Sequence, residues 1–286
     1  MIKVASGWKD YEIIATGDGE KLERWGKLVL LRPDPQVIWH AKTPLASNPK
    51  INAIYHRSSS GGGGWQFKGN VPDNFVIERN GLRFSLKLMG FKHTGLFPEQ
   101  AANWDIMQDL IKNAKRDIKV LNLFAYTGGA TVACAKAGAH VTHVDAAKAM
   151  VERAKENVSL SGVDTTHVRY IVDDCLKFIQ REIKRGNKYD AIIMDPPSYG
   201  RGANGEVWKI ENSIHDLVIK CREVLSDNPL FFLINSYTTG LQPTVMENIL
   251  KMSLRGLDGK FDSYEVGLPT NEGINLPCGC SALWTK

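Results

Sequence analysis

The sequence predicts an α/β fold in which the strands of a mostly parallel sheet alternate with helices, preceded by a small β-rich domain. From about Gln100 onwards, short apolar runs alternate with segments whose apolar residues recur at helical spacing, as in successive βαβ units. Before that point the apolar runs are short and β-prone, and Gly and Pro separate them. We therefore expect a small β-rich domain over residues 1–92 and an α/β domain over residues 93–286.

The expected N-terminal domain consists of short strands. β-prone runs occupy residues 11–15, 27–31, 36–39, 75–78 and 82–88. The last two runs flank Asn80-Gly81, a dipeptide that is a strong signal of a two-residue hairpin turn. The serines and glycines of residues 58–64 predict a flexible loop.

The expected α/β domain begins with a helix, because Trp104, Met107, Ile111 and Ala114 fall at helical spacing. Strands are predicted at residues 119–124, 140–144, 167–172, 189–194, 229–235, 261–266 and 281–284. Helices are predicted between the first six of them, at about residues 129–137, 147–161, 175–185, 212–225 and 243–254. The last two strands have no helix between them, which favours an antiparallel pair at one edge of the sheet.

The composition argues against a membrane-spanning, secreted or disulfide-rich protein. The 286 residues are 43% hydrophobic, which allows a sizeable core, and no apolar run approaches the length of a membrane-spanning helix. The N-terminus lacks the apolar core of a secretory signal, and five cysteines are an odd number, so we expect a reduced, cytoplasmic protein. The net charge is +5, but residues 1–95 carry +6. This basic excess suits an anionic partner such as RNA, although many soluble domains carry a similar excess.

The most informative stretch runs from Val120 to Thr131, where an apolar run ends in a glycine-bearing turn that opens a helix. The next apolar run ends on Asp145, 23 residues after Asn122. This spacing is typical of a nucleoside site at the carboxyl ends of parallel strands, where glycines admit the ligand and an acid accepts from ribose hydroxyls. The alternatives are an ordinary strand-to-helix turn and an aspartate that caps a helix.

We expect the cofactor contacts to come from three successive strand ends. The first contributes Phe124, Ala125, Tyr126, Thr127, Gly128 and Gly129, the second Asp145 and Ala146, and the third Asp173, Asp174 and Cys175. At the third strand end, one aspartate is expected to accept from an adenine amino group and the other to cap the following helix.

A fourth strand end carries Asp195-Pro196-Pro197-Ser198-Tyr199. Two prolines fix φ and present rigid carbonyls, so Asp195, Pro196 and Pro197 can accept from a base and Tyr199 can stack on it. Asp195 is also expected to contact the cofactor. Pro-Pro can also simply terminate a strand, but an acid at this edge favours a functional loop. Together with the glycine turn, the loop points to S-adenosylmethionine and methyl transfer, in which catalysis is mainly positional.

These motifs resemble the class I S-adenosylmethionine-dependent methyltransferases, and more narrowly the bacterial large-subunit ribosomal RNA methyltransferase group. The resemblance covers roughly Asn80 to Lys286. Leu121–Gly128 matches that group's Leu-Asn-Leu-Phe-x-Tyr-Thr-Gly motif, and Thr94–Gln100 matches its Thr-Gly-x-Phe-x-x-Gln segment. The resemblance implies a seven-stranded Rossmann-like methyltransferase sheet with S-adenosyl-L-methionine as cofactor. It also implies that Thr94, Gly95 and Gln100 help to enclose that cofactor.

The chain departs from the members that methylate carbon 5 of cytosine, which carry a catalytic cysteine shortly after strand five. Residues 235–239 contain no cysteine here, and the N-terminal part is shorter than the RNA-binding module of the long members. A base nitrogen is therefore the favoured target. Cys278 or Cys280, expected just before the last strand, is the alternative source of a thiol. No metal site is expected, because Cys278-Gly279-Cys280 lacks two further ligands at zinc spacing.

The leading hypothesis is therefore a cytoplasmic methyltransferase whose partner is RNA, ribosomal RNA in particular. A methyltransferase for a small molecule or a protein is the second hypothesis, and a non-catalytic RNA-binding protein with a cofactor fold is the third. No membrane partner is expected, and the sequence leaves the oligomeric state open. Residues 200–205 are glycine-rich and predict a mobile flap after the Asp-Pro-Pro loop.

Overall fold

The computed structural model describes residues 1–58, 62–90, 92–201 and 207–286. The chain folds into two compact units. The larger unit comprises Met1–Lys3, Ala102–Val266 and Cys278–Lys286, and the smaller unit comprises Val4–Ala101 and Gly267–Pro277. The segment Gly267–Pro277 thus joins a unit that is distant from it in sequence, which no pattern in the sequence indicated.

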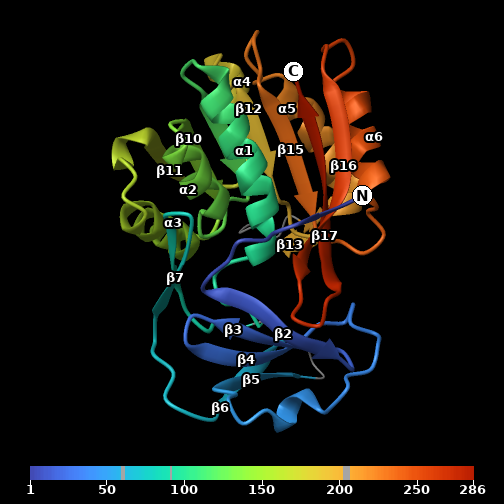
Figure 1. Ribbon diagram of the computed structural model, residues 1–286. Coiled ribbons are helices and arrows are strands. Elements are labelled where there is room, and N and C mark those ends of the chain that lie inside the picture. Colours follow the sequence, from blue (N-terminus) through green and yellow to red (C-terminus); the bar gives the residue numbers. More distant parts are fainter. Residues whose placement is uncertain (59–61, 91, 202–206) are drawn as a thin grey trace. The chain divides into compact units, whose positions relative to one another are not determined.

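The larger unit is built on a sheet that has eight strands within the described residues, in the order β1-β16-β17-β15-β12-β9-β10-β11 (Figure 1). The strands are β1 (Ile2–Val4), β9 (Lys119–Leu123), β10 (His140–Asp145), β11 (Val168–Val172), β12 (Ala191–Met194), β15 (Phe231–Ser236), β16 (Lys260–Pro269) and β17 (Asn275–Thr285). The strands from β15 to β11 are parallel, and β17 is antiparallel to β15. The predicted mixed α/β fold is confirmed.

Two details of the predicted sheet are corrected. The short strand β1 lies beside β16, so the sheet has eight strands within the described residues rather than seven. The last two strands, β16 and β17, are neighbours as predicted, and the short strand β1 lies outside them at the edge. Strand β17 also begins at Asn275, so Cys278 and Cys280 lie within it rather than before it.

Helices cover the sheet, and their amphipathic faces explain where they lie. They are α1 (Ala101–Ala114), α2 (Gly129–Lys136), α3 (Lys148–Leu160), α4 (Cys175–Arg185), α5 (Ile210–Arg222) and α6 (Pro243–Ser253). Buried residues of α4, α5 and α6 form one core cluster with Leu121 and Leu123 of β9. Because side chains alternate along a strand, Asn122 points to the other face, where it donates to Thr131 of α2 at 2.9 Å.

The smaller unit contains a five-stranded sheet, β2-β3-β4-β5-β6, and a separate hairpin, β7-β8, within the part of the chain that the structure describes. The strands are β2 (Tyr11–Gly17), β3 (Glu20–Trp25), β4 (Leu28–Pro33), β5 (Ala53–Arg57), β6 (Gly63–Phe67), β7 (Phe75–Arg79) and β8 (Leu82–Leu86). Short 3-10 helices occupy Leu45–Ser47 and Pro98–Gln100 here, and Thr165–His167 in the larger unit.

The predictions for the smaller unit hold in part. The Asn80-Gly81 hairpin is confirmed, since both residues have positive φ, 51° and 79°, as the favoured two-residue turn requires. The strand predicted at residues 36–39 is wrong, because this segment is turn and irregular structure. Of the predicted loop at residues 58–64, Gly63 and Gly64 belong to β6, and residues 59–61 lie outside the described residues.

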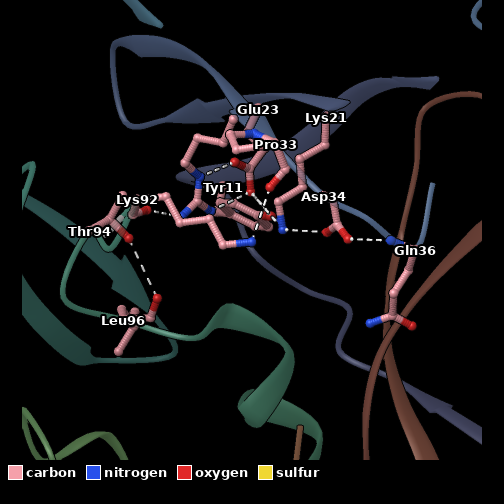
Figure 2. A network of polar contacts seen from close by, with 10 residues as sticks. Tyr11, Lys21, Glu23, Pro33, Asp34, Gln36, Lys92, Thr94 and Leu96 are labelled. Atoms are coloured by element: carbon pink, nitrogen blue, oxygen red, sulfur yellow. Dashed lines mark hydrogen bonds and ion pairs between the residues drawn. The ribbon is translucent and has the colours of Figure 1, made fainter. Parts of the chain in front are cut away.

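A buried ion pair explains why the charged strand β3 lies inside this sheet (Figure 2). Glu23 is fully buried and accepts from Arg32 Nε at 2.6 Å and from the Tyr11 hydroxyl at 2.6 Å. Burial opposes ionisation of Glu23, but Arg32 and Lys21 outweigh it and lower its pKa to about 2. Arg32 also donates to the carbonyl of Lys92 at 2.8 Å, which ties the chain just before Thr94 to β4.

Candidate functional site

The candidate site lies where parallel strands of the larger unit end together. In the strand register, Leu123 is level with Val144 and with Met194, and Met194 is level with Ile234. The residues that follow these strands therefore lie along one edge of the sheet. This edge brings together the glycine turn, Asp145, the residues after β11 and the Asp-Pro-Pro loop, as the sequence predicted.

The turn after β9 has an unusual backbone. Phe124 and Tyr126 have positive φ, 54° and 50°, which is uncommon for residues other than glycine. Hydrogen bonds hold this conformation. The N–H of Phe124 donates to Cys175 Sγ at 3.3 Å, and the N–H of Tyr126 donates to Asp145 Oδ2 at 2.8 Å. These two N–H groups already have acceptors within the protein. A ligand would therefore contact the surface and the carbonyl groups of the turn rather than these donors.

The two glycines of the turn are required by helix packing. A Cβ on Gly128, which has φ +84°, would lie 2.8 Å from the Cβ of Ala154 in α3. A Cβ on Gly129 would lie 2.6 Å from Trp104 Cζ2 in α1. The predicted role of these glycines is to allow close approach of a ligand, whereas the contacts that the structure shows are with neighbouring helices. Thr127, just before Gly128, is buried, and its carbonyl accepts from Asn157 of α3 at 2.8 Å.

Asp145 ends β10 and is held on both carboxylate oxygens. Oδ2 accepts from the N–H of Tyr126 at 2.8 Å, and Oδ1 accepts from the N–H of Ala147 at 2.8 Å. Burial raises the pKa of Asp145 and outweighs these two hydrogen bonds, which lower it. A carboxylate oxygen has more than one lone pair, so each oxygen can accept a further hydrogen bond from a ligand. Ala146, beside it, is exposed.

The carboxylates after β11 have separate partners. Asp174 caps α4 by accepting from the N–H of Lys177 at 2.9 Å, as one of the pair was expected to do. Asp173 forms an ion pair with Arg181 and accepts from the N–H of Asp174 at 2.9 Å. Cys175 is buried against the turn, and its sulfur accepts from the N–H of Phe124. In the predicted contact with adenine, the Asp173 carboxylate would therefore bind the adenine amino group and Arg181 at the same time.

The Asp-Pro-Pro loop follows β12 and is anchored at several points. Asp195 Oδ1 accepts from Asn235 Nδ2 of β15 at 2.9 Å. Pro196 is buried, and the hydroxyls of Ser198 and Thr238 are 2.6 Å apart. Tyr199 is 51% exposed, and its hydroxyl accepts from Arg201 Nε at 2.8 Å.

A small hairpin supports this loop and was not anticipated. It consists of β13 (Tyr199–Arg201) and β14 (Val207–Lys209), and residues 202–205 of the predicted flap lie outside the described residues. Trp208 Nε1 donates to the carbonyl of Pro197 at 2.6 Å. The Trp208 ring centroid lies 5.5 Å from that of Phe124. Trp208 thus joins the Asp-Pro-Pro loop to the glycine turn.

Sequence reasoning missed two residues of this arrangement, Trp208 and Asn235. A weak signal for Asn235 was present, because a polar residue ends the apolar run of β15 beside the strand that ends in Asp195. For Trp208 no local signal exists, since its role depends on the fold of the hairpin onto the loop.

Of the two thiols of β17, Cys278 is partly exposed and Cys280 is buried. Cys280 pairs with Ser236 in the strand register, at the same edge of the sheet as Asp195. Its side chain is buried and donates to the carbonyl of Leu241 at 2.9 Å. Burial, with smaller contributions from Glu265 and Asp195, raises the pKa of Cys280 to about 11. At neutral pH the thiol is therefore protonated and a poor nucleophile.

Thr94, Gly95 and Gln100 belong to the smaller unit. Thr94 is buried, and its carbonyl accepts from the N–H of Lys87 at 3.1 Å. Gly95 has φ 98°, a conformation that favours glycine. Gln100 ends a 3-10 helix just before α1. Their part in enclosing the cofactor stays a prediction.

Two kinds of feature are absent from the described residues. There is no grouping there of three or more His, Cys, Asp or Glu side chains suited to a metal ion. Likewise, no helix in that part of the chain combines the length and the apolar character needed to span a membrane.

Comparison with known proteins identifies the family. Residues 19–226 match the family described as S-adenosylmethionine-dependent methyltransferase, which is well over half of the chain. The chain belongs to this methyltransferase family. Its cofactor is therefore S-adenosylmethionine, and the strand-edge site is where members of the fold class hold such ligands.

A solved structure and two curated proteins are similar to this methyltransferase. The crystal structure of the SAM-dependent methyltransferase from Agrobacterium tumefaciens is 35% identical, with a TM-score of 0.93 over 100% of this chain and 93% of that one. The ribosomal RNA large subunit methyltransferase I of Tolumonas auensis is 37% identical over 134 residues, 46% of this chain. The ribosomal RNA large subunit methyltransferase K of Neisseria meningitidis is 27% identical over 241 residues, 81% of this chain and 67% of its own length.

The match to the Tolumonas enzyme spans 33% of that enzyme's length. This methyltransferase therefore shares only a part of that relative, and the substrate of the whole relative does not transfer to it directly.

Proposed function

We propose that this methyltransferase transfers the methyl group of S-adenosylmethionine to a base nitrogen of RNA, ribosomal RNA in particular. The observation that carries the proposal is the Asp195-Pro196-Pro197 loop, anchored by Asn235 at the strand edge that also carries the glycine turn and Asp145. The names of the ribosomal RNA large subunit methyltransferases I, K and K/L to which the chain is similar support RNA as the acceptor.

The residues of the strand edge fit the cofactor by their chemistry. Asp145 would accept from the ribose hydroxyls, because both oxygens are fixed by backbone N–H groups and retain acceptor capacity. Phe124–Gly129 would follow the methionine half of the cofactor. Ala146 and Cys175 would line the adenosine, and Asp173 or Asp174 would accept from the adenine amino group. Thr94, Gly95 and Gln100 of the smaller unit would help to enclose the cofactor.

The acceptor base would be held by the loop after β12. The sulfonium of S-adenosylmethionine supplies an activated methyl group, so the protein needs only to align the attacking atom and exclude water. Asp195 and the carbonyls of Pro196 and Pro197 would accept from the N–H groups of the base and so aim a nitrogen lone pair. Tyr199, which is half exposed, would stack on the face of the base.

The burial and the raised pKa of the Cys280 thiol support a nitrogen target. Methylation at carbon 5 of cytosine requires a thiolate that first adds to the ring. The Cys280 thiol is buried, is bonded to a carbonyl and has its pKa raised to about 11. A nitrogen lone pair needs no such addition, which agrees with the absence of cysteine at residues 235–239.

We also propose that residues 1–92 recognise the RNA while residues 93–286 carry out the transfer. The basic excess of +6 over residues 1–95 supports RNA binding by the N-terminal part, because lysines and arginines neutralise phosphates.

The proposal is tested by methyl transfer to defined classes of acceptor. The purified enzyme and S-adenosylmethionine labelled in the methyl group are incubated with deproteinised large-subunit ribosomal RNA, with total protein or with small metabolites, all from a strain that lacks the gene. Label should enter the RNA, and Asp195→Ala should lose this transfer while retaining part of its cofactor affinity. Label in the protein or the metabolite fraction alone would replace RNA as the acceptor.

A further inference from the structure

A chain of buried side chains runs from the interior of the larger unit to Asp195. The Tyr264 hydroxyl lies 2.8 Å from Asn103 Oδ1, and Asn103 Nδ2 lies 3.0 Å from Ser281 Oγ. Ser281 Oγ lies 2.8 Å from Asn235 Oδ1, and Asn235 Nδ2 lies 2.9 Å from Asp195 Oδ1. The four residues behind Asp195 are at most 1% exposed.

The carboxylate sets the direction of every hydrogen bond in this chain. An ionised Asp195 only accepts, so Asn235 must turn its NH₂ group towards it and its carbonyl oxygen towards Ser281. The Ser281 hydroxyl then donates to Asn235, which leaves its oxygen to accept from the NH₂ group of Asn103. The Tyr264 hydroxyl donates to the side-chain oxygen Oδ1 of Asn103. All four donors therefore point along the chain towards Asp195.

The members come from elements that are remote in sequence. Tyr264 lies on β16, Asn103 on α1, Ser281 on β17 and Asn235 on β15. Strand register places Ser281 opposite Asn235 across the β15–β17 pair. Apolar side chains at these buried positions would need no hydrogen-bond partners, whereas each of the four polar side chains does. Donors aligned in one direction in a low-dielectric interior reinforce one another, and their combined effect falls on the last acceptor.

We propose that Asn235, Ser281, Asn103 and Tyr264 are positioning residues that hold the Asp195 carboxylate in one orientation for the acceptor base. This inference rests on the proposed role of Asp195 in binding that base. The hydrogen bond from Asn235 to Oδ1 restricts rotation of the carboxylate and so keeps it in one orientation. None of the four residues needs to touch the cofactor or the acceptor.

The first test is a kinetic double-mutant cycle with large-subunit ribosomal RNA from a strain that lacks the gene. Ser281→Ala removes the middle hydroxyl, and we expect kcat to fall about tenfold, the equivalent of one lost hydrogen bond, with KM for S-adenosylmethionine unchanged within about twofold. Because the effect passes through Asn235, adding Ser281→Ala to Asn235→Leu, which already breaks the chain of hydrogen bonds, should change kcat by less than about twofold. An equal tenfold loss in both backgrounds, or no loss in the wild-type background, would overturn the inference.

A matched control separates positioning from general loosening of the core. Ser253 is also buried, but its hydroxyl makes no hydrogen bond within the described part of the chain. Ser253→Ala is therefore the same substitution without a lost bond, and it should keep kcat. If Ser253→Ala lowers kcat as much as Ser281→Ala does, a general structural effect replaces the positioning role.

The second test does not depend on the acceptor. Crystal structures of the wild-type enzyme and of Asn235→Leu, which keeps the bulk but loses the donor, are compared at Asp195. The carboxylate should occupy one rotamer in the wild-type enzyme and leave it in the variant. An unchanged Asp195 rotamer would refute the positioning role. If the wild-type enzyme methylates no RNA, the proposed function fails, and this comparison still decides the inference.

Discussion

Replacing Asp145 by asparagine tests the assignment of the cofactor ribose most sharply. The substitution keeps the size of the side chain and one acceptor oxygen. It removes the charge and turns the other oxygen into an NH₂ group, which cannot accept from the N–H of Tyr126 or of Ala147. The alanine variant would instead release both backbone N–H groups, now bonded at 2.8 Å, and would disturb the turn as well.

The expected magnitude follows from the bonds at stake. A hydrogen bond to a charged group contributes about 1.5–3 kcal/mol, which corresponds to a loss of affinity of roughly 10- to 150-fold. Titration calorimetry with S-adenosylmethionine should show this loss for Asp145→Asn. Unchanged affinity would show that Asp145 does not accept from the cofactor.

Asp164 offers a matched control for this measurement. It also accepts from a backbone N–H, that of Thr166, at 2.9 Å. It lies before β11, at the opposite edge of the parallel sheet from the strand ends that form the site. Asp164→Asn should therefore leave the cofactor affinity unchanged, and a comparable loss there would point to a general effect of removing a carboxylate.

The same residue makes cofactor binding depend on pH. Burial raises the pKa of Asp145, so protonation begins above the usual range of an aspartate. Cofactor affinity should be full at neutral pH and fall as pH drops through this raised pKa, while Asp145→Asn should show no such fall. The effect of Asp145 on folding stability runs in the opposite direction. Burial disfavours its ionised form, so the protonated carboxyl stabilises the fold relative to the carboxylate, and this stabilisation is lost as pH rises through the raised pKa.

Three further predictions concern packing, the buried ion pair and the thiols. Gly129→Ala should lower the free energy of unfolding by about 1–3 kcal/mol, because its methyl would lie 2.6 Å from a ring atom of Trp104. Glu23→Ala should cost about 3–5 kcal/mol in urea unfolding, because it leaves Arg32 buried and unpaired. Wild-type stability should likewise decline as pH falls from about 4.5 to about 2, the ordinary and the lowered pKa of Glu23. RNA that contains 5-fluorocytosine should form no covalent adduct with the enzyme in denaturing electrophoresis.

Each of these predictions has its own control. Combined with Trp104→Phe, which removes the crowded ring atom, Gly129→Ala should cost less than it does alone, and equal costs would contradict the packing argument. Glu12→Ala breaks a partly exposed pair with Arg24 and should cost less than about 1 kcal/mol. An adduct band that disappears in Cys280→Ser or Cys278→Ser would restore cytosine carbon 5 as the target.

The larger unit could be predicted well because its signals are local and periodic. Apolar runs bounded by glycine or aspartate gave the parallel strands β9, β10, β11, β12 and β15 in their observed places. The carboxyl ends of parallel strands share one edge, so the grouping of the glycine turn, Asp145 and Asp195 followed from topology alone.

The smaller unit was harder to predict because its strands depend on distant partners. Strand β3 has the sequence Glu-Lys-Leu-Glu-Arg-Trp, in which only Leu22 and Trp25 are apolar, too few to indicate an internal strand. It is a central strand because Glu23 meets Arg32 from β4, a pairing that periodicity cannot reveal. The role of Asn235 was missed for a similar reason, since only the fold brings β17 and α1 to its other side.

The central claim is methylation of a base nitrogen in ribosomal RNA, and mass spectrometry of modified nucleosides tests it most directly. Large-subunit ribosomal RNA is compared between a strain that lacks the gene and the same strain supplied with the wild-type gene or with Asp195→Ala. We predict that one nitrogen-methylated nucleoside is missing from the deletion strain, returns with the wild-type gene and does not return with the variant. Identical nucleoside profiles in all the strains, or loss of 5-methylcytidine instead, would contradict it.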